Sequence, residues 1–121
     1  MKKILVDTNF LIYCAKEKID FFEYAKLEGL GVIIPEEVLS ELSRLENTNQ
    51  RKNVNVVKKI LRVSEFEKIS LKRTYVDRGI IEYLEDKKEI ILATMDRDLQ
   101  KKVKNPILSI REKVKFELFN R

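Results

Sequence analysis

The chain has 121 residues, of which 44% are hydrophobic and 37% are charged, and its formal net charge is +5. This length suits one domain, residues 1–121, with a core of its own. The sequence contains no histidine and a single cysteine, Cys14. These counts exclude an intramolecular disulfide, zinc sites built from histidine and cysteine, histidine acid–base catalysis and a Ser-His-Asp triad. Catalysis would therefore use carboxylates, lysines, tyrosines or a hard metal ion, and the positive charge favours a polyanionic partner.

The sequence gives no sign of a membrane segment or a signal peptide. Its longest apolar runs, residues 31–35 and 90–93, have the length of strands, whereas a helix needs about 20 apolar residues to cross a bilayer. Asp7 and Asn9 interrupt the apolar segment near the N-terminus, which is not typical of a signal peptide. We therefore expect a cytoplasmic protein without membrane contact.

The first half of the chain alternates between short strands and helices. Residues 4–6 predict a buried strand that ends at Asp7 and is followed by an amphipathic helix carrying Phe10, Leu11 and Cys14. The further predicted elements are a helix at 20–27, a strand at 31–34, a helix from Pro35 to about residue 45, a polar loop at 47–53 and a helix at 54–63.

The second half continues the alternation. The predicted elements are a weak strand at 66–71, a helix from Thr74 to about Asp86, a buried strand at 90–94, a short helix at 96–103, a last strand at 107–110 and a polar tail. The strand at 90–94 is continuously apolar from Ile90 to Ala93, as is typical of parallel strands covered on both sides. The pattern predicts a three-layer α/β fold with a mainly parallel sheet.

Four acidic residues are expected near one edge of this sheet. Asp7 and Asp96 directly follow strands, while Glu41 and Asp77 lie on helices that follow other strands. The carboxyl ends of parallel strands share one edge, so these side chains should approach each other. Asp77 falls in an arc of its helix that core residues otherwise occupy, which would bury its charge.

Structural roles for these acids are the alternative. Asp7 and Asp96 can cap the helices that follow them, and Thr74 with Asp77 fits a capping box. Glu41 can be a solvated surface glutamate. If the carboxylates do converge, their repulsion calls for a cation, and oxygen ligands without histidine or thiolate favour Mg²⁺ or Mn²⁺.

Four short motifs occur in a fixed order along the chain. They are Val6-Asp7-Thr8-Asn9, Pro35-Glu36-Glu37-Val38-Leu39-Ser40-Glu41-Leu42, Val76-Asp77-Arg78-Gly79-Ile80-Ile81 and Ala93-Thr94-Met95-Asp96-Arg97-Asp98-Leu99. On these motifs the chain resembles the PIN-domain ribonucleases, and the likeness spans residues 4–110. Within that family it looks more like archaeal relatives of ribosomal-RNA-processing nucleases than like VapC toxins.

The resemblance implies a Rossmann-like α/β/α domain and a metal-dependent endoribonuclease. It implies that Asp7, Glu41, Asp77 and Asp96 are the catalytic acids and hold Mg²⁺ or Mn²⁺, with Asp98 as an auxiliary metal ligand. The reaction would hydrolyse phosphodiester bonds in single-stranded or looped RNA and leave 5′-phosphate and 3′-hydroxyl ends. Processing of ribosomal RNA is the role that this resemblance suggests.

Basic side chains near the same edge are candidates for RNA binding. They are Arg78, Arg97, Lys101 and Lys102, with Arg51 and Lys52 in the polar loop. A solvated charged surface is the alternative. Tyr75 either stacks on a base or is a half-buried helix residue. Apolar residues in the tail and in residues 21–27 suggest a homodimer contact.

Three other hypotheses remain. The domain can be a non-catalytic RNA-binding or ribosome-assembly module, or a VapC-type toxin ribonuclease restrained by an antitoxin. The third is a Toprim domain, because Asp96 and Asp98 resemble its Asp-x-Asp motif. A Toprim domain would place a glutamate where Asp7 stands.

Overall fold

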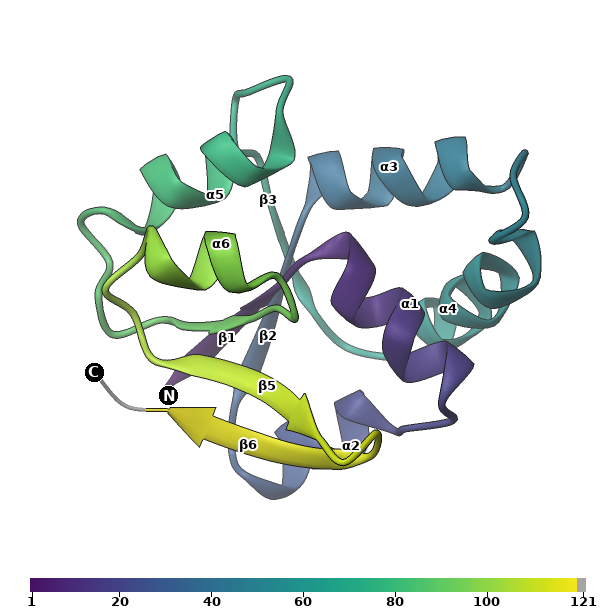
Figure 1. The fold of residues 1–121 in the computed structure, drawn as a ribbon, viewed down its shortest axis with the longest axis horizontal. Coiled ribbons are helices and arrows are strands. Elements are labelled where there is room, and N and C mark those ends of the chain that lie inside the picture. The colour runs from purple at the N-terminus through teal and green to yellow at the C-terminus, as the bar shows by residue number, and fades with distance from the viewer. Residues whose placement is uncertain (120–121) are drawn as a thin grey trace.

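The computed structural model describes residues 1–119 and contains a six-stranded sheet with the order β3-β2-β1-β4-β5-β6 (Figure 1). Its first five strands pair in parallel, and β6 pairs antiparallel with β5. The strands are β1 (Lys3–Val6), β2 (Gly31–Pro35), β3 (Glu67–Ile69), β4 (Ile91–Ala93), β5 (Ile107–Arg111) and β6 (Lys115–Phe119). The predicted α/β fold with a mainly parallel sheet is confirmed.

Helices flank the sheet. They are α1 (Thr8–Lys16), α2 (Phe21–Leu27), α3 (Glu36–Leu45), α4 (Arg51–Val63), α5 (Val76–Leu84) and α6 (Arg97–Lys101). Right-handed crossovers between parallel strands place α1 to α4 on one face of the sheet and α5 and α6 on the other. The helices α1, α3 and α4 contact one another, and Figure 1 shows them away from α5 and α6.

The core lies around the two central strands. Ile4, Leu5 and Val6 of β1 are fully buried, as are Leu92 and Ala93 of β4. Their side chains are apolar on both faces because helices cover both faces of a parallel sheet. Cys14 is also buried, and burial raises the pKa of its thiol to about 12. It serves as the small core residue that the sequence predicts.

The C-terminal segment differs from the predicted polar tail, because residues 115–119 form the strand β6. Phe116 of this strand stacks on Tyr24 with ring centroids 4.1 Å apart and also contacts the ring of Phe21. Three of the aromatic residues predicted to supply a dimer contact thus pack within the chain. Leu27 and Phe119 stay exposed on the same segments, so the homodimer stays a prediction.

Two helix starts also differ from the prediction. The helix α4 begins at Arg51, which places Arg51 and Lys52 in its first turn instead of in a loop. The helix α5 begins at Val76, with Tyr75 as its N-cap and no hydrogen bond from a capping side chain. The predicted capping box of Thr74 and Asp77 is therefore absent. No helix among residues 1–119 has the length and apolar character needed to cross a bilayer.

Candidate active site at the carboxyl edge of the sheet

The two central strands create a crevice at their carboxyl ends. The chain leaves β1 toward β2 and leaves β4 toward β5, so the direction of the connections reverses between β1 and β4. Ligands of open α/β sheets bind at such a switch point. Asp7 follows β1 directly, and its N–H donates to the carbonyl oxygen of Ala93 at the end of β4, 3.3 Å away. Asp96 lies three residues beyond Ala93.

Asp7 is buried at this point, with only 6% of its surface exposed. Its Oδ1 atom accepts a hydrogen bond of 2.8 Å from the N–H of Phe10, which caps α1, and its Oδ2 atom accepts from the hydroxyl of Thr94. Burial raises the pKa of Asp7 to about 6, against the two hydrogen bonds, which lower it. The charges of Asp77 and Asp96 raise this pKa further. Asp7 therefore caps a helix, as the structural alternative holds, and also belongs to an acidic cluster.

Thr94 joins Asp7 to Asp96. This residue is fully buried at the end of β4, and while its hydroxyl group donates to Asp7, the hydroxyl oxygen accepts from the N–H of Asp96 at 3.1 Å. Thr94 belongs to one of the four sequence motifs, but no role was predicted for it. The signal available there is a polar residue that ends a wholly apolar strand.

Asp96 caps α6 and keeps one oxygen free. Its Oδ1 atom accepts from the N–H groups of Asp98 and Leu99 at 2.9 and 3.2 Å. Its Oδ2 atom makes no hydrogen bond with the residues that the structure describes. The cap thus fixes the carboxylate while one oxygen stays available for a ligand.

Asp77 is exposed in the first turn of α5, so the predicted position in the core is wrong. Val76, Gly79, Ile80 and Leu84 form the buried face of this helix, and Asp77 lies beside that face. Partial desolvation raises its pKa, and the charges of Asp96 and Glu41 raise it further. Lys102 has the opposite effect on this pKa.

Glu41 completes the cluster from the other side of the sheet. Glu41 is half-buried in α3, whereas Asp77 belongs to α5. The charge of Glu41 nevertheless raises the pKa of Asp77, so the two side chains lie near each other at this edge. The four predicted acids are thus brought to one edge of the sheet. Asp98 lies in the first turn of α6. No interaction among residues 1–119 joins its carboxylate to Asp7, Asp77 or Glu41.

The chemistry of this edge suits a hard divalent cation. Its ligands would be carboxylate oxygens, and Thr8 beside Asp7 adds a buried hydroxyl oxygen with no hydrogen-bond partner among the described residues. Within residues 1–119, no group of three or more aspartate, glutamate or cysteine side chains lies close enough together to hold a metal ion as it stands. The cluster is therefore an open, repulsive arrangement that a cation would neutralise.

The predicted RNA-binding cations fall into two groups. Arg78 lies in α5, while Arg97, Lys101 and Lys102 lie in or next to α6. The second group, Arg51 and Lys52, lies in α4, on the other side of the molecule in Figure 1. All six side chains are exposed, and none forms an ion pair with another residue of the described chain.

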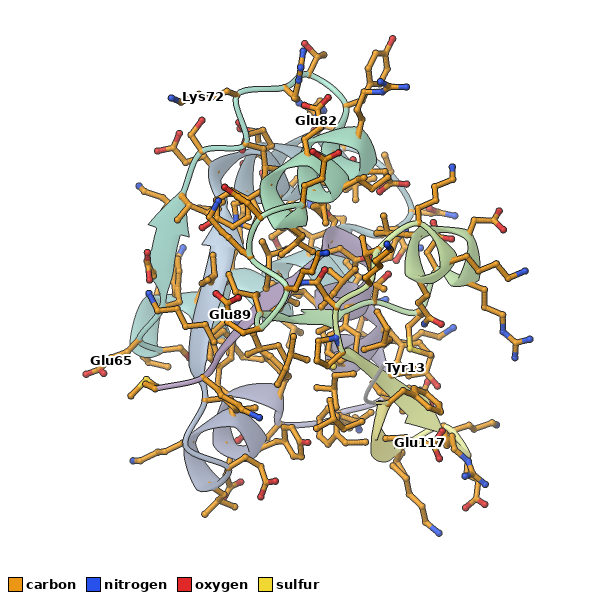
Figure 2. The ribbon with its side chains drawn as sticks, turned by 90° about the vertical axis from the view of Figure 1, so that its left-hand side faces the viewer. Tyr13, Glu65, Lys72, Glu82, Glu89 and Glu117 are labelled. Carbon is orange, nitrogen blue, oxygen red and sulfur yellow. The ribbon has the colours of Figure 1, made fainter. Side chains whose placement is uncertain are left out.

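The loop of residues 70–75, which leads from β3 to α5, is joined to α3 and α5 by hydrogen bonds and an ion pair. Glu37 at the start of α3 accepts hydrogen bonds from the Leu71 N–H at 3.0 Å and the Ser70 hydroxyl at 3.3 Å. Arg73 pairs with Glu82 of α5 at 2.5 Å, and Figure 2 shows Lys72 and Glu82 at the same end of the molecule. Of the two predictions for Tyr75, the half-buried one is wrong, because the side chain is 77% exposed.

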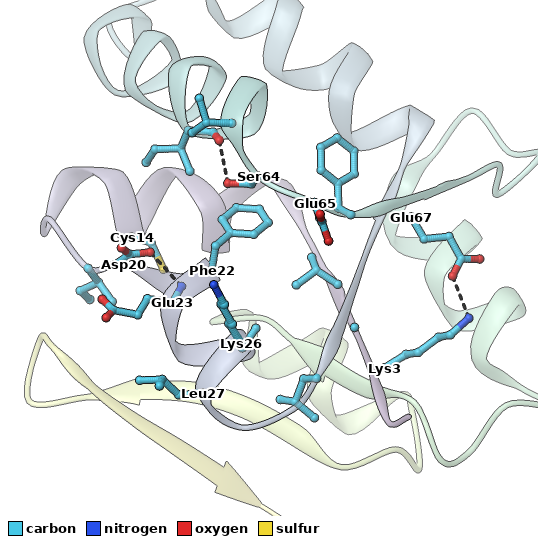
Figure 3. A pocket seen from close by; sticks show the side chains of 18 of the residues that line it. Lys3, Cys14, Asp20, Phe22, Glu23, Lys26, Leu27, Ser64, Glu65 and Glu67 are labelled. Atoms are coloured by element: carbon cyan, nitrogen blue, oxygen red, sulfur yellow. Dashed lines mark hydrogen bonds and ion pairs between the residues drawn. The ribbon is translucent and has the colours of Figure 1, made fainter.

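A large cavity lies elsewhere. It has a volume of about 1450 Å³ and lies between α2, the end of α4 and β3 (Figure 3). Lys3 and Gly31, at the starts of β1 and β2, line it, so it lies at the edge opposite the acids. None of the four acids lines this cavity.

The chain matches a known protein family. The family model described as "PIN like domain" matches residues 4–113, so the chain belongs to the PIN-like domain family. The family predicted from the four motifs is thereby confirmed.

Individual relatives include ribonucleases and rRNA-processing proteins. "Ribonuclease VapC4" of Methanocaldococcus jannaschii is 31% identical over 98% of both chains. The "rRNA-processing protein fcf1" of Schizosaccharomyces pombe is 29% identical over 88% of this chain, which spans only 58% of that protein. Among solved structures, the PIN domain endonuclease Utp24 superposes with a TM-score of 0.77 and 26% identity, covering 96% of this chain and 90% of the other.

Proposed function

We propose that the chain is a metal-dependent endoribonuclease whose active site is the acidic cluster between β1 and β4. The observation that carries this proposal is the hydrogen-bonded connection of Asp7, Thr94 and Asp96 at the switch point. Asp77 and Glu41 lie near this pair of aspartates, because Asp77 raises the pKa of Asp7 and Glu41 raises the pKa of Asp77. The family and the named activities of the relatives support the same reaction class.

Asp7, Asp77 and Asp96 would hold Mg²⁺ or Mn²⁺, with Glu41 as a direct or water-mediated ligand and Asp98 as an auxiliary acid. When bound, such an ion supplies an activated water and stabilises the charge on the leaving oxygen. The hydrolysis would leave 5′-phosphate and 3′-hydroxyl ends. The chain has no histidine to act as the base of a route through a 2′,3′-cyclic phosphate.

The chain's own residues prepare the site in two ways. Thr94 and the N–H of Phe10 fix both oxygens of Asp7, so this carboxylate needs no reorientation when a ligand arrives. Burial and the neighbouring acids keep the carboxylates in a high-energy state when no cation is present. Both effects favour tight binding of a divalent cation.

The substrate in this proposal is single-stranded or looped RNA. The exposed, unpaired cations of α5 and α6 lie closest to the acids and would contact its phosphates. Arg51 and Lys52 form a separate, more distant group. The rRNA-processing relatives favour a ribosomal RNA substrate. The proposal places the enzyme in the cytoplasm and takes residues 1–121 as a single PIN domain.

A VapC-type toxin is the second candidate function, because the relative that matches 98% of the chain is named Ribonuclease VapC4. In this case an antitoxin would restrain the enzyme, and its expression alone should arrest growth of the host cell. Expression of Asp96→Asn should then be harmless. Normal growth with an active wild-type enzyme would favour the processing role.

The deciding experiment is a cleavage assay on a mixed pool of single-stranded RNA with Mg²⁺, Mn²⁺ or EDTA. The wild type should cleave only with a metal ion and should leave 5′-phosphates, whereas Asp96→Asn should not cleave. If neither protein cleaves but both bind RNA, the chain is a non-catalytic RNA-binding or ribosome-assembly module.

A further inference from the structure

A second, smaller cavity lies between α5 and the segment that follows α6. It has a volume of about 370 Å³, which falls in the size range of small-ligand pockets. Three lysines contribute to its wall, namely Lys88, Lys102 and Lys104, and Glu85 is its one acidic residue. None of the three lysines forms an ion pair within residues 1–119. We call this cavity the lysine pocket.

Asn105 fixes the backbone on both sides of the lysine pocket. It is 1% exposed, and its Nδ2 atom donates to the carbonyl oxygens of Lys87 and Ile90 at 2.8 and 2.9 Å. The turn that carries Lys88 is thereby tied to the segment that carries Lys104. The two lysines face one cavity because this buried amide joins their backbones.

The lysine pocket lies at the C-terminal end of α5, near the amino ends of β4 and β5, whereas Asp77 is in the first turn of the same helix. Ile81 and Glu85, which line the pocket, follow Asp77 at intervals of four residues, and such positions lie above one another on a helix. Lys102 lines the pocket, and its positive charge is also near enough to Asp77 to lower the pKa of that carboxylate. An RNA strand that crosses Asp77 and follows this side of α5 would reach the pocket about two helical turns further on.

The lining of the pocket favours a phosphate over a base. It contains no aromatic side chain on which a base could stack, and its apolar members are Ile81, Leu84 and Val103. Lysine ammonium groups bind phosphate as mobile point charges, and within the described chain none of these three forms an ion pair with a carboxylate, Glu85 included.

We propose that the lysine pocket binds a backbone phosphate of the substrate RNA, on a nucleotide beyond the one cleaved. This inference rests on the proposed ribonuclease function and assigns part of the path of the strand. It also assigns RNA contacts to Lys88 and Lys104, which lie outside the cations predicted from the sequence.

The test compares two double variants in the cleavage-deficient Asp96→Asn protein. Lys88→Gln/Lys104→Gln removes two charges from the pocket, and Lys16→Gln/Lys26→Gln removes two exposed, unpaired charges elsewhere. Binding of a labelled single-stranded RNA is measured by fluorescence anisotropy over a range of salt concentrations. Circular dichroism and thermal melting show whether each variant is folded.

The pocket variant should lose one phosphate contact. The magnitude of the negative slope of log K against log salt concentration should then decrease by about 0.7. If parent and variant bind equally at 1 M salt, this decrease corresponds to about fivefold weaker binding by the variant at 0.1 M salt. The control variant should keep the parent slope. In the cleavage-competent background, the pocket variant should raise KM and leave kcat unchanged. Oligonucleotides trimmed until they no longer reach the pocket should bind parent and variant alike.

Three outcomes would overturn the inference. Equal slopes for the two double variants would mean that the lysines are a solvated surface, while the ribonuclease proposal stands. Failure of the Asp96→Asn parent to bind RNA, together with failure of the wild type to cleave it, would overturn both proposals. In an NMR titration, inorganic phosphate alone can shift the amide resonances of Lys88 and Lys104 until the shifts saturate. If it does so while RNA binding by the variant is unchanged, the pocket is assigned to a free anion.

Discussion

The hydroxyl group of Thr94 donates to the carboxylate of Asp7, and its oxygen accepts from the backbone N–H of Asp96. One buried side chain thus sets the position of the two aspartates that follow the central strands.

Replacing Thr94 by valine should reduce cleavage without unfolding the protein. Valine has nearly the same shape but cannot donate to Asp7, so activity and Mn²⁺ affinity should each fall by about 10- to 100-fold, the usual effect of losing a residue that orients a metal ligand. The bond from Thr94 lowers the pKa of Asp7, so its loss should also shift the acidic limb of the pH–rate profile upward. Thr94→Ser keeps the hydroxyl group and should retain most of the activity. Unchanged kinetics in Thr94→Val would contradict this role.

Asp7→Asn should stabilise the metal-free protein. The pKa of Asp7 is about 6 in the folded state against 3.8 for the free group, a difference equivalent to about 3 kcal/mol in favour of the unfolded state at pH 7. Asparagine removes this penalty but weakens the cap on Phe10, so we expect a net gain of about 1 to 3 kcal/mol in the free energy of unfolding. Urea denaturation in EDTA at pH 7.5 measures it.

The same variant should change the pH dependence of stability. Between pH 4 and pH 6 the folded wild type binds more protons at Asp7 than the unfolded chain does. The contribution of Asp7 to stability therefore falls as the pH rises through this window. The difference in free energy of unfolding between Asp7→Asn and wild type should be near zero at pH 4 and reach its full value above about pH 7. A difference that does not vary with pH would show that Asp7 has an ordinary pKa.

Divalent metal ions should stabilise the wild type and not its acidic-site variants. An ion at 100 times its dissociation constant adds about 2.7 kcal/mol, which is a rise in melting temperature of about 8 to 14 °C for a domain of this size. Asp96→Asn should lose most of this rise. Glu89→Gln is the matched control, because Glu89 precedes β4 and thus lies at the opposite edge of the sheet. An equal rise in all three proteins would indicate binding outside the cluster.

Gly79→Ala should destabilise the protein although alanine favours helices. A Cβ atom at Gly79 would lie 2.9 Å from the Cβ of Leu71 and 3.2 Å from the Cβ of Arg73. This overlap should cost about 1 to 3 kcal/mol, which outweighs the gain of about 1 kcal/mol in helix propensity. Urea denaturation measures the change. Ser40→Ala, on the exposed surface of α3, should be neutral or slightly stabilising.

The sequence predicts those parts of the site that follow from strand ends. Asp7 and Asp96 each follow a continuous apolar run, and parallel pairing then brings them together. Residues whose position depends on packing escape this reasoning. Helix periodicity places Asp77 in the core, but the buried face of α5 includes Gly79, which lies close to Leu71, and Asp77 falls beside that face.

The other differences between the predicted and the observed structure also arise from contacts between distant parts of the chain. Phe116 and Leu118 alternate with charged residues, which is the period of a strand, but the segment appears polar until its aromatic partners Tyr24 and Phe21 are known. The role of Thr94 depends on a hydrogen bond between residues 87 positions apart in the sequence. No local pattern reports such a contact.

Glu41 and Asp77 belong to helices on opposite faces of the sheet, so the acidic cluster exists only when both helical layers are packed. A fluctuation that loosens α3 or α5 alone would disperse the acids while most of the strands and helices stay intact. Enzymatic activity should therefore disappear earlier along a denaturation curve than the far-ultraviolet signal of secondary structure. For this protein, catalysis is a stricter measure of the native state than helix content.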